Sequence, residues 1–260
     1  MGEGIGVRMN KSWLEGKTAL ITGAARRIGH EVAVALADEG VNVVAHYRAS
    51  ADEARELSAE LRERGVKSWL VKADFETPEE YETLVERAAR AAGSLDILVN
   101  NAAIFPPSTL QEVQLKDLVQ SVQVNAWAPF VLCRDFARLV GKGKIVNLLD
   151  TRATGYDWSH VAYILSKKML AEFTRMAALE FAPGITVNAV APGLILPPPG
   201  KDQSHLDELA KTLPMQRHGD PGDVVQAIIY LLKSDFVTGQ VIFVDGGRHL
   251  MEQTGGPHPD

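Results

Sequence analysis

The stretch 17–29 constrains the fold of this chain more than any other. Its residues at 19–21 form a short apolar run, which predicts a buried strand. A turn follows at Gly23, and apolar side chains then recur at helical spacing as far as Leu36. Because the N–H groups at the start of such a helix point beyond the carboxyl end of the strand, this order predicts a site for the phosphates of a dinucleotide.

The glycines of this turn have an unusual spacing. The turn reads Gly23-x-x-x-Arg27-x-Gly29 instead of the common G-x-G-x-x-G, so that an arginine stands where a glycine is frequent. An arginine adds a fixed positive charge beside the expected phosphates, in exchange for some access to the backbone. The alternative interpretation is structural, with the glycines serving only a tight turn and close packing.

Length and composition are those of an ordinary globular protein. With 260 residues, 46% of them hydrophobic and 23% charged, the chain can bury the core of one α/β domain or at most two small ones. The net charge is −6, and no basic cluster indicates nucleic acid as a partner. No apolar run approaches the roughly 18 residues needed to span a membrane.

The N-terminal residues and the single cysteine favour a cytoplasmic protein. Residues 1–12 are punctuated by glycines and lack an apolar segment of signal-peptide length. Cys133 lies in an apolar helical run, where we expect a buried, unreactive thiol in a reducing compartment. The seven histidines show no ligand spacing, and we therefore expect no metal site.

Segments typical of strands and helices alternate along the rest of the chain. Strands are expected at 19–21, 41–45, 69–71, 97–99, 145–149, 186–190 and 241–244. Helices are expected from the first turn to Gly40, at 50–64, 77–93, 115–139 and 160–181, and from 220 onward. Seven buried strands and six intervening helices predict a single-domain, Rossmann-like, doubly wound parallel sheet with helices on both faces.

The expected domain covers 15–247, between an N-terminal extension at 1–14 and a partly disordered C-terminal tail at 248–260. The segment 192–214 interrupts the alternation after the sixth strand and contains three consecutive prolines. Because ligands bind at the carboxyl ends of such strands, this segment is a candidate substrate lid. The alternative is a loop that its prolines merely straighten.

The second strand indicates which nucleotide would bind. A carboxylate about 20 residues past the glycines favours the ribose hydroxyls of NAD, whereas a cation there accommodates the extra phosphate of NADP. No acid occurs at 41–51, Arg48 and Ser50 lie at the end of this strand, and Arg27 is expected nearby. NADP is therefore the expected cofactor, unless Arg48 is only a solvated surface residue.

Candidate catalytic residues lie in the second half of the chain. Asp150 ends the fifth strand, and Tyr163 and Lys167 follow on one face of the next helix, four residues apart. A phenol is a weak acid at neutral pH, and we expect the neighbouring ammonium to lower its pKa and favour the phenolate. Such a pair can give or take a proton beside a hydride acceptor.

Over essentially all of 15–247 the chain resembles the short-chain dehydrogenase/reductase family. The matching pieces are the turn at 22–29, Ala73-Asp74, Asn100-Asn-Ala102, Asn125, Tyr163 with Lys167, Pro192-Gly193 and Asp245-Gly-Gly247. The resemblance implies that Asp74 contacts the adenine and that 100–102 supports the central sheet and the cofactor. It also implies that Lys167 binds the nicotinamide ribose, that Tyr163 donates the proton and that Asn125 holds a proton-relay water.

The family pattern assigns the remaining positions of the site. The expected cofactor contacts are Gly23, Arg26, Arg27, Ile28, Gly29, Tyr47, Arg48, Ser50, Asp74, Phe75, Asn101, Ala102, Ala103, Lys167, Pro192, Gly193 and Leu194. The expected substrate contacts are Arg27, Phe105, Asp150, Tyr163 and Leu194, and the expected catalytic residues are Asp150, Tyr163, Lys167 and Asn125. Members are usually tetramers or dimers that associate through their long fourth and fifth helices, so the resemblance implies a homotetramer.

Two departures from the family pattern narrow the expected activity. Asp150 stands where most members have a serine, and Ala103 replaces the glycine that usually follows Asn-Asn-Ala. The pteridine reductases and the similar dihydromonapterin reductases share the aspartate, the arginine of the turn and often an aromatic residue at the position of Phe105. Several of them also share His46-Tyr47. The threonine that is common a few residues past Gly193 is absent here.

The expected reaction is NADPH-dependent reduction of a dihydropterin-type ring, such as dihydrobiopterin, dihydromonapterin or dihydrofolate, to its tetrahydro form. A carboxylate would repel the alkoxide of a carbonyl substrate, whereas Asp150 can accept from the guanidine-like edge of a pterin or, when protonated, supply a proton. Phe105 would form one wall of a slot for the flat ring, or alternatively pack its loop onto the sheet. Two other functions stay open: a general carbonyl or 3-oxoacyl reductase, and an NADP-binding regulatory protein without turnover.

Overall fold

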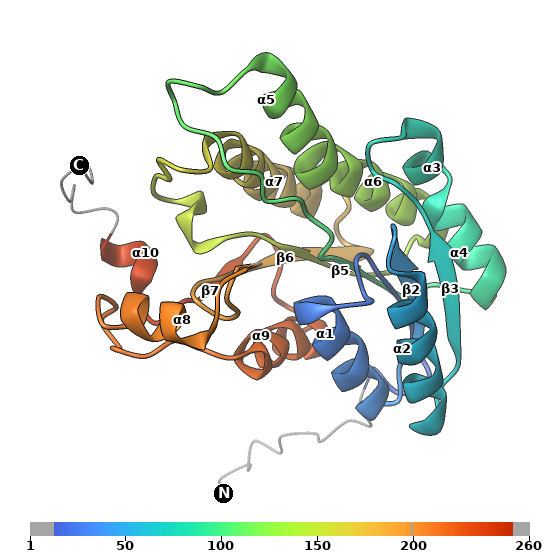
Figure 1. The fold of residues 1–260 in the computed structure, drawn as a ribbon. Helices are drawn as coiled ribbons and strands as arrows, with labels where there is room; N and C mark the ends of the chain where they lie inside the picture. The colour runs from blue at the N-terminus through green and yellow to red at the C-terminus, as the bar shows by residue number, and fades with distance from the viewer. Residues whose placement is uncertain (1–12, 199, 252–260) are drawn as a thin grey trace, which may run out of the picture.

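The protein is described here by a computed structural model that covers residues 13–198 and 200–251 (Figure 1). Its strands are β1 (Thr18–Ile21), β2 (Asn42–Tyr47), β3 (Ser68–Lys72), β4 (Ile97–Asn100), β5 (Gly143–Leu148), β6 (Ile185–Pro192) and β7 (Val241–Val244). Its helices are α1 (Arg27–Asp38), α2 (Ala51–Glu63), α3 (Pro78–Glu82), α4 (Leu84–Ala92), α5 (Leu115–Val122), α6 (Ala128–Val140), α7 (Val161–Glu180), α8 (Gln203–Ala210), α9 (Pro221–Lys233) and α10 (Arg248–Met251). A π-helical segment at Gln123–Trp127 joins α5 to α6, and a 3₁₀ turn at Thr151–Ala153 follows β5.

The strands of these described residues form one parallel sheet of order β3-β2-β1-β4-β5-β6-β7. The chain moves outward from β1 to β3, returns to β4 beside β1, and continues in the other direction to β7. This reversal opens a crevice at the carboxyl ends of β1 and β4, where doubly wound folds bind their ligands. The predicted Rossmann-like fold is confirmed.

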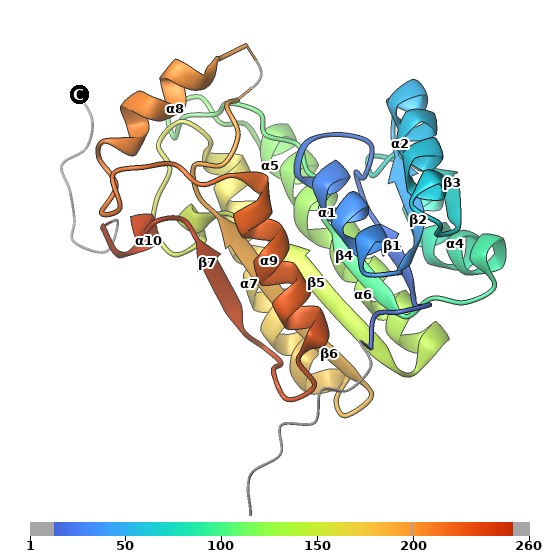
Figure 2. The same ribbon diagram turned by 90° about the horizontal axis from the view of Figure 1, so that it is seen from below.

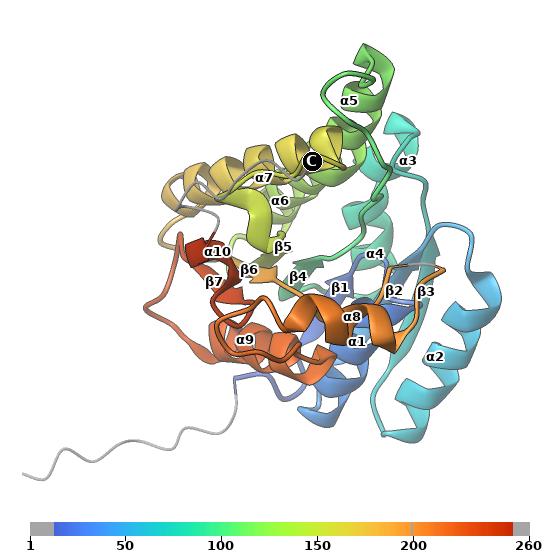
Figure 3. The ribbon, with the colours of Figure 1, turned by 60° about the vertical axis from the view of Figure 1, so that its left-hand side comes forward.

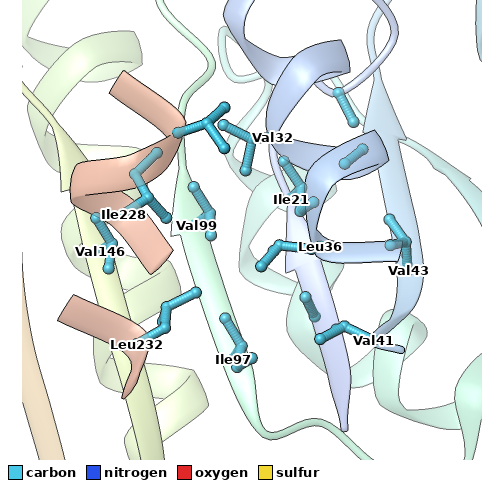
Figure 4. Packing of buried hydrophobic residues seen from close by; sticks show 14 of the residues in the cluster. Ile21, Val32, Leu36, Val41, Val43, Ile97, Val99, Val146, Ile228 and Leu232 are labelled. Carbon is cyan, nitrogen blue, oxygen red and sulfur yellow. The ribbon is translucent and has the colours of Figure 1, made fainter. Parts of the chain in front are cut away.

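Helices cover both faces of the sheet (Figures 1 and 2). On one face α1, α2 and α9 pack on the sheet, and Ile21 of β1 lies in one cluster with Leu36 and Ile228 (Figure 4). The opposite face is covered by α4, α6 and α7, where the neighbouring strand residue Leu20 shares a second cluster with Phe136. Because side chains on both sides of each strand are buried, the strands are almost continuously apolar.

Two long helices expected from the sequence are interrupted. The segment expected as one helix at 77–93 is divided at Thr83, whose hydroxyl donates to a carbonyl of the preceding turn at 3.0 Å. The helix expected at 115–139 passes through the π-helical segment. Pro129 lies just beyond that segment and has no N–H to donate to the carbonyl of Asn125, so the α-helical ladder cannot continue there unbroken.

The packed domain extends past the expected bounds at both ends. Leu14, expected to belong to the extension, is fully buried in the core. At the other end α10 takes up the first residues of the expected tail, and the ring of His249 stacks on Phe243 at 4.0 Å. Most of the expected extension and tail, 1–12 and 252–260, lies outside the described residues, and so does the expectation of a disordered tail.

The candidate lid at 192–214 contains a helix and is not irregular throughout. α8 lies beyond the carboxyl ends of the strands, at the end of the sheet where α1 begins (Figures 2 and 3). Its Leu206 and Ala210 are buried, so α8 is packed onto the domain.

Two further predictions concern the cysteine and membrane spans. Cys133 is buried in α6, its sulfur accepts from Nδ2 of Asn100 at 3.2 Å, and burial raises the pKa of the thiol to about 12. The predicted burial of the thiol is therefore confirmed, and its raised pKa disfavours the reactive thiolate. Within residues 13–198 and 200–251, none of the helices has the length and apolar character that a membrane crossing requires.

Candidate active site

The turn after β1 is held by groups from a neighbouring strand. Gly23 has a left-handed φ of 63°, which glycine adopts without strain. Asn101, directly after β4, donates from its side-chain amide to the carbonyls of Thr22 and Gly23 at 2.9 and 3.0 Å. A Cβ on Gly29 would lie 2.2 Å from the carbonyl oxygen of Gly23, so only glycine lets α1 pass this closely. The turn therefore has the close backbone approach that a phosphate-binding turn needs.

His46 of β2 connects the turns that follow β1 and β3. Its Nδ1 accepts from the N–H of Gly23 at 3.1 Å, and its Nε2 lies 3.0 Å from the carbonyl oxygen of Ala73. Burial lowers the pKa of this ring to about 4, so it is neutral and its single proton lies on Nε2. The ring also stacks on Phe75 at 4.7 Å. His46 thereby sets the spacing between the loops of the crevice.

A cavity of about 460 Å³ opens between these turns. The expected cofactor contacts that line it are Gly23, Arg26, Arg27, Ile28, Tyr47, Arg48, Ser50, Asp74, Phe75, Asn101, Ala102 and Ala103. They follow the carboxyl ends of β1 to β4, which is the crevice expected from the topology. Gly29, Lys167 and the residues at 192–194 do not line this cavity.

Two arginines at the edge of the cavity are paired with carboxylates. Arg26 forms an ion pair with Glu53, and Arg48 forms one with Glu76 at 3.3 Å. Both guanidinium groups are more than half exposed, at 60% and 53%. Exposed ion pairs are weak, so another anion of suitable geometry can replace either carboxylate.

Arg27 connects the turn to the candidate lid. It has a φ of 56°, and its Nη2 donates to the carbonyl of Pro197 at 2.9 Å. Earlier in the same segment, the N–H of Gly193 donates to the carbonyl of Val244 at 2.9 Å, and a Cβ there would lie 2.7 Å from Cα of Asp245. Gly193 therefore lies against the end of β7, and residues 192–194 do not line the cavity.

A second group of polar side chains follows β5. Asp150 caps the 3₁₀ turn by accepting the N–H of Arg152 on Oδ1 at 2.9 Å. The hydroxyl of Tyr163, in the first turn of α7, donates to Oδ2 of Asp150 at 3.2 Å. Lys167, one turn further, donates from Nζ to the carbonyl of Leu148 at 2.7 Å. The fold thus brings three of the expected catalytic side chains together.

The electrostatics of this group differ from the sequence expectation. Burial, followed by the negative charge of Asp150, raises the pKa of Tyr163 well above its usual value. Burial also lowers the pKa of Lys167 to about 8. The expectation that the ammonium favours the phenolate is wrong, because Nζ bonds the carbonyl of Leu148 while a carboxylate contacts the hydroxyl. Tyr163 is therefore held as a phenol, the form that can donate a proton.

Asn125 links this group to the cavity. It lies in the π-helical segment, where its Oδ1 accepts from the N–H of Ile104 at 2.8 Å and its Nδ2 donates to Oγ of Ser166 at 3.1 Å. The Ser166 hydroxyl in turn donates to the carbonyl of Tyr163 at 2.5 Å, and Ile104 lines the cavity. Protein groups engage the side-chain amide of Asn125, and the expected relay water stays a prediction.

Phe105 lies over the hydroxyl end of this group. Its ring stacks on His160 at 3.9 Å and meets the ring of Tyr163 edge to face at 4.6 Å. The guanidinium of Arg152 lies 5.5 Å from the centre of the same ring. With 39% of its surface exposed, Phe105 is not a core residue. This exposure favours a wall beside Tyr163 over simple packing of the loop.

The sequence interpretation missed Arg152, Asp157 and His160. Arg152 donates from Nε and Nη2 to the two carboxylate oxygens of Asp150 at 3.0 and 3.1 Å, and it also forms an ion pair with Asp157. His160 lies 3.2 Å from Asp157. The available signal was the spacing Asp150-x-Arg152. In an extended segment residues two apart lie about 7 Å apart along the chain, and only the 3₁₀ turn folds this arginine back onto the carboxylate.

Comparison with known proteins places this geometry in a family. The family model described as enoyl-(acyl carrier protein) reductase matches residues 23–249. The 3-oxoacyl-[acyl-carrier-protein] reductase FabG of Staphylococcus epidermidis is 31% identical over 246 residues, which covers 90% of this chain and 99% of that protein. Crystal structures of FolM alternative dihydrofolate reductase 1 from Brucella canis and Brucella suis, both with NADP, are each 31% identical to this chain. Their TM-scores are 0.84 and 0.86, and the matches cover 90% of this chain and 95% and 96% of theirs.

The matches extend over nearly the whole described domain and agree with its fold. Reductases named for two different substrates stand at the same 31% identity, so the family is shown and the substrate is not. The chain belongs to the short-chain dehydrogenase/reductase family of NAD(P)-dependent oxidoreductases.

Proposed function

We propose that this protein is an NADPH-dependent reductase of a dihydropterin-type ring. The observation that carries the proposal is the contact between the Tyr163 hydroxyl and the Asp150 carboxylate, at 3.2 Å. A ketone reduced beside Tyr163 would develop negative charge on its oxygen, which the carboxylate would repel. The guanidine-like edge of a pterin presents N–H donors instead, and a carboxylate accepts them.

The residues of the cavity suit NADPH as the hydride donor. α1 begins directly after the turn that follows β1, and the N–H groups of its first turn would hold the pyrophosphate. Arg26, Arg48 and Ser50 lie together at the edge of the cavity near the end of β2, where the 2′-phosphate of NADPH would replace the carboxylates of Glu53 and Glu76. The FolM structures from Brucella, which contain NADP, support this choice of cofactor.

In the proposed reaction one proton is transferred to the substrate by a side chain beside β5. Tyr163 donates it to the ring nitrogen next to the carbon that receives the hydride, and its raised pKa keeps the proton in place until then. Lys167, whose Nζ donates to the carbonyl of Leu148, would hold the nicotinamide ribose. Phe105 would stack on one face of the flat ring, beside Tyr163.

A second candidate function is reduction of a 3-oxoacyl thioester. Its support is the 31% identity to FabG and the enoyl-(acyl carrier protein) reductase description of the matching family model. In that case Asp150 would have to be tolerated beside the developing alkoxide. A third candidate, an NADP-binding regulatory protein without turnover, would keep the cavity and leave the polar group after β5 unused.

Oxidation of NADPH, measured against a panel of acceptors, tests these functions. Turnover with dihydrobiopterin, dihydromonapterin or dihydrofolate is expected, with little or none on 3-oxoacyl thioesters and simple ketones. Turnover only on the carbonyl compounds would support the second candidate, and tight NADPH binding without any turnover would support the third. The variant Asp150→Ser should lose about tenfold or more of its dihydropterin kcat/KM while any ketone activity stays or rises. An Asp150→Ser variant that reduces dihydropterins as fast as the parent would refute the proposal.

A further inference from the structure

The loop between β5 and α7 carries an ion-pair network for which the proposed reaction has no role so far. Arg152 and Asp157 are nearly buried, with 17% and 5% of their side chains exposed. Two nitrogens of Arg152 bond the two oxygens of Asp150, and a third contacts Asp157. Asp157 is itself fixed by the backbone N–H groups of Ser159 and His160, at 2.7 and 3.0 Å. Arg152 is thus clamped between two carboxylates.

This clamp determines the hydrogen-bonding capacity of Asp150. A carboxylate offers about four acceptor positions. Oδ1 of Asp150 accepts from the backbone N–H and Nε of Arg152, at 2.9 and 3.0 Å, and Oδ2 accepts from Nη2 of Arg152 at 3.1 Å. The remaining position on Oδ2 receives the Tyr163 hydroxyl at 3.2 Å, which is the longest of the four bonds. Only this last bond can be exchanged without moving the loop.

The surroundings of Asp150 also set its charge. Burial alone would raise the pKa of the carboxyl, but the charge and hydrogen bonds of Arg152 outweigh burial, and the pKa lies below its ordinary value. The other charged and titratable groups around Asp150 and Arg152 are Asp157, His160, Tyr163, Lys167 and Arg248. In this environment Asp150 stays a carboxylate at neutral pH and below.

Resting on the proposed function, we propose that Arg152 is a positioning residue that keeps Asp150 an anion with one exchangeable acceptor position. The substrate then takes over both ends of the bond between Tyr163 and Asp150. Its N–H donates to Oδ2 of Asp150, and its ring nitrogen accepts from the Tyr163 hydroxyl. The site therefore selects rings that carry both an N–H donor and an acceptor nitrogen, and Tyr163, not Asp150, supplies the proton. A ketone offers only the acceptor and would leave Oδ2 facing its oxygen.

The dependence of kcat/KM on pH tests this role. In the parent, kcat/KM for a dihydropterin should change by no more than about twofold between about pH 8 and about pH 5. In Arg152→Gln the buried carboxyl of Asp150 loses its cation, so it takes up a proton as the pH falls and no longer accepts the substrate N–H. We expect kcat/KM of this variant to fall about tenfold or more over the same range, mainly through KM.

Three variants separate this effect from a general structural defect. Asp150→Asn combined with Arg152→Gln has no carboxyl at position 150 and keeps Asp157, so its pH dependence should return to that of the parent if Asp150 is the group that titrates. Arg152→Lys keeps the charge without the fork and should give an intermediate profile. Arg90→Gln removes the same side chain from an exposed pair with Glu86 on α4 and should leave the profile unchanged.

A measurement independent of turnover separates this inference from the proposed function. The ¹³Cγ resonance of Asp150 should titrate at a clearly lower pH in the cofactor-free parent than in Arg152→Gln or, if that variant does not fold, at a slightly lower pH than in Arg152→Lys. This difference without dihydropterin turnover would remove the proposed function and leave the role of Arg152 standing. The same titration in parent and variants, or a loss of activity that is equal at all pH values, would overturn the inference.

Discussion

Asp150 places a negative charge beside the Tyr163 hydroxyl, where a serine would place a neutral hydroxyl. Its carboxylate contacts the phenolic hydroxyl directly and raises the pKa of Tyr163, together with burial. Oxidation of an alcohol or amine needs a base and hence the phenolate, which this neighbour disfavours. Reduction needs the phenol, which the neighbour preserves. At the scale of single residues, the site is therefore built for reduction.

The variant Tyr163→Phe tests the proton donor. We expect kcat for a dihydropterin to fall by roughly 10²-fold or more, because the donor is lost while the turn and cavity that hold the cofactor stay intact. NADPH affinity, measured by fluorescence titration, should change little. Nearly full activity in this variant would mean that water or Asp150 delivers the proton.

Lys167 gives a prediction about stability and pH. Burial lowers its pKa to about 8, so between about pH 8 and about pH 10.4 the unfolded chain binds a proton that the folded chain has released. Stability of the cofactor-free parent should therefore rise with pH in this window, and the charged lysine destabilises the fold below it. Replacing Lys167 by methionine removes this dependence.

The measurement is urea unfolding of the parent and Lys167→Met at about pH 7 and about pH 10. Lys167→Met should gain stability relative to the parent at the lower pH. The free energy of unfolding of the variant minus that of the parent should therefore be larger at about pH 7 than at about pH 10. The exposed lysine at 211, changed in the same way to give Lys211→Met, serves as the control and should show no such difference. An identical effect of Lys167→Met on the free energy of unfolding at both pH values would contradict a lowered pKa of Lys167 in the folded state.

At the scale of elements, the strands could be predicted because their side chains are buried on both faces. All seven expected strands exist, with bounds that differ by one or two residues at most ends. The π-helical interruption was not predicted, although Pro129 inside the expected helix is a signal for a break. The folding of 203–210 into α8 was missed, because three prolines precede it and its buried face is short. The sequence does not show that Leu206 and Ala210 would be buried against the rest of the domain.

The residues of the site also fall into those that could be predicted from the sequence and those that could not. Residues placed by regular elements, such as Asp150 and Tyr163, meet as expected, since the end of β5 and the first turn of α7 adjoin in this topology. Arg152 was not predictable, because its contact depends on the local geometry of a 3₁₀ turn. The pKa of Tyr163 was predicted in the wrong direction for a related reason: the sequence shows that Lys167 is close along the helix, but not that the Tyr163 hydroxyl donates to Asp150.

The end of β2 and the start of α1 together give a prediction about the cofactor. We expect the protein to prefer NADPH to NADH, because the expected phosphate position is lined by Arg26 and Arg48 and lacks a carboxylate at 41–51. Arg48→Ala should weaken NADPH by about 1–3 kcal/mol, the contribution of a charge-assisted contact, and leave NADH unchanged. Steady-state kcat/KM for the two cofactors checks both statements.

A matched substitution sharpens this prediction. Glu76→Gln removes the carboxylate that pairs with Arg48, so NADPH no longer has to displace it, and its KM should fall. The exposed arginine of α4 provides the control Arg90→Ala, which should leave both cofactors unaffected. Equal kcat/KM for NADPH and NADH in the parent would sink the prediction.

At the scale of the whole molecule, many exposed apolar side chains belong to helices that cover one face of the sheet. Figure 1 shows these helices, α5, α6 and α7, next to one another. On α5, the π-helical segment, α6 and α7 these side chains are Leu115, Val119, Trp127, Leu139, Leu165, Met169, Met176 and Leu179. Single exposed apolar residues are ordinary, but a concentration on adjacent helices is typical of an interface. This is the surface through which the family resemblance implies a homotetramer.

The assembly can be tested by one charge on that surface. The parent is expected to be a tetramer by light scattering coupled to size exclusion. Met176→Glu, or Leu179→Glu, would place a carboxylate in a desolvated interface and should reduce the mass to that of a dimer or monomer. Leu110 lies outside these helices and is exposed to the same 64% as Met176, so Leu110→Glu is a matched control that should keep the mass of the parent. Because the side chains of Leu110, Met176 and Leu179 are already exposed in the single chain, none of these changes should unfold the domain. Far-ultraviolet circular dichroism of all three variants should match that of the parent. A monomeric parent, or an unchanged mass in both α7 variants, would show that these apolar residues face water and that the resemblance does not extend to assembly.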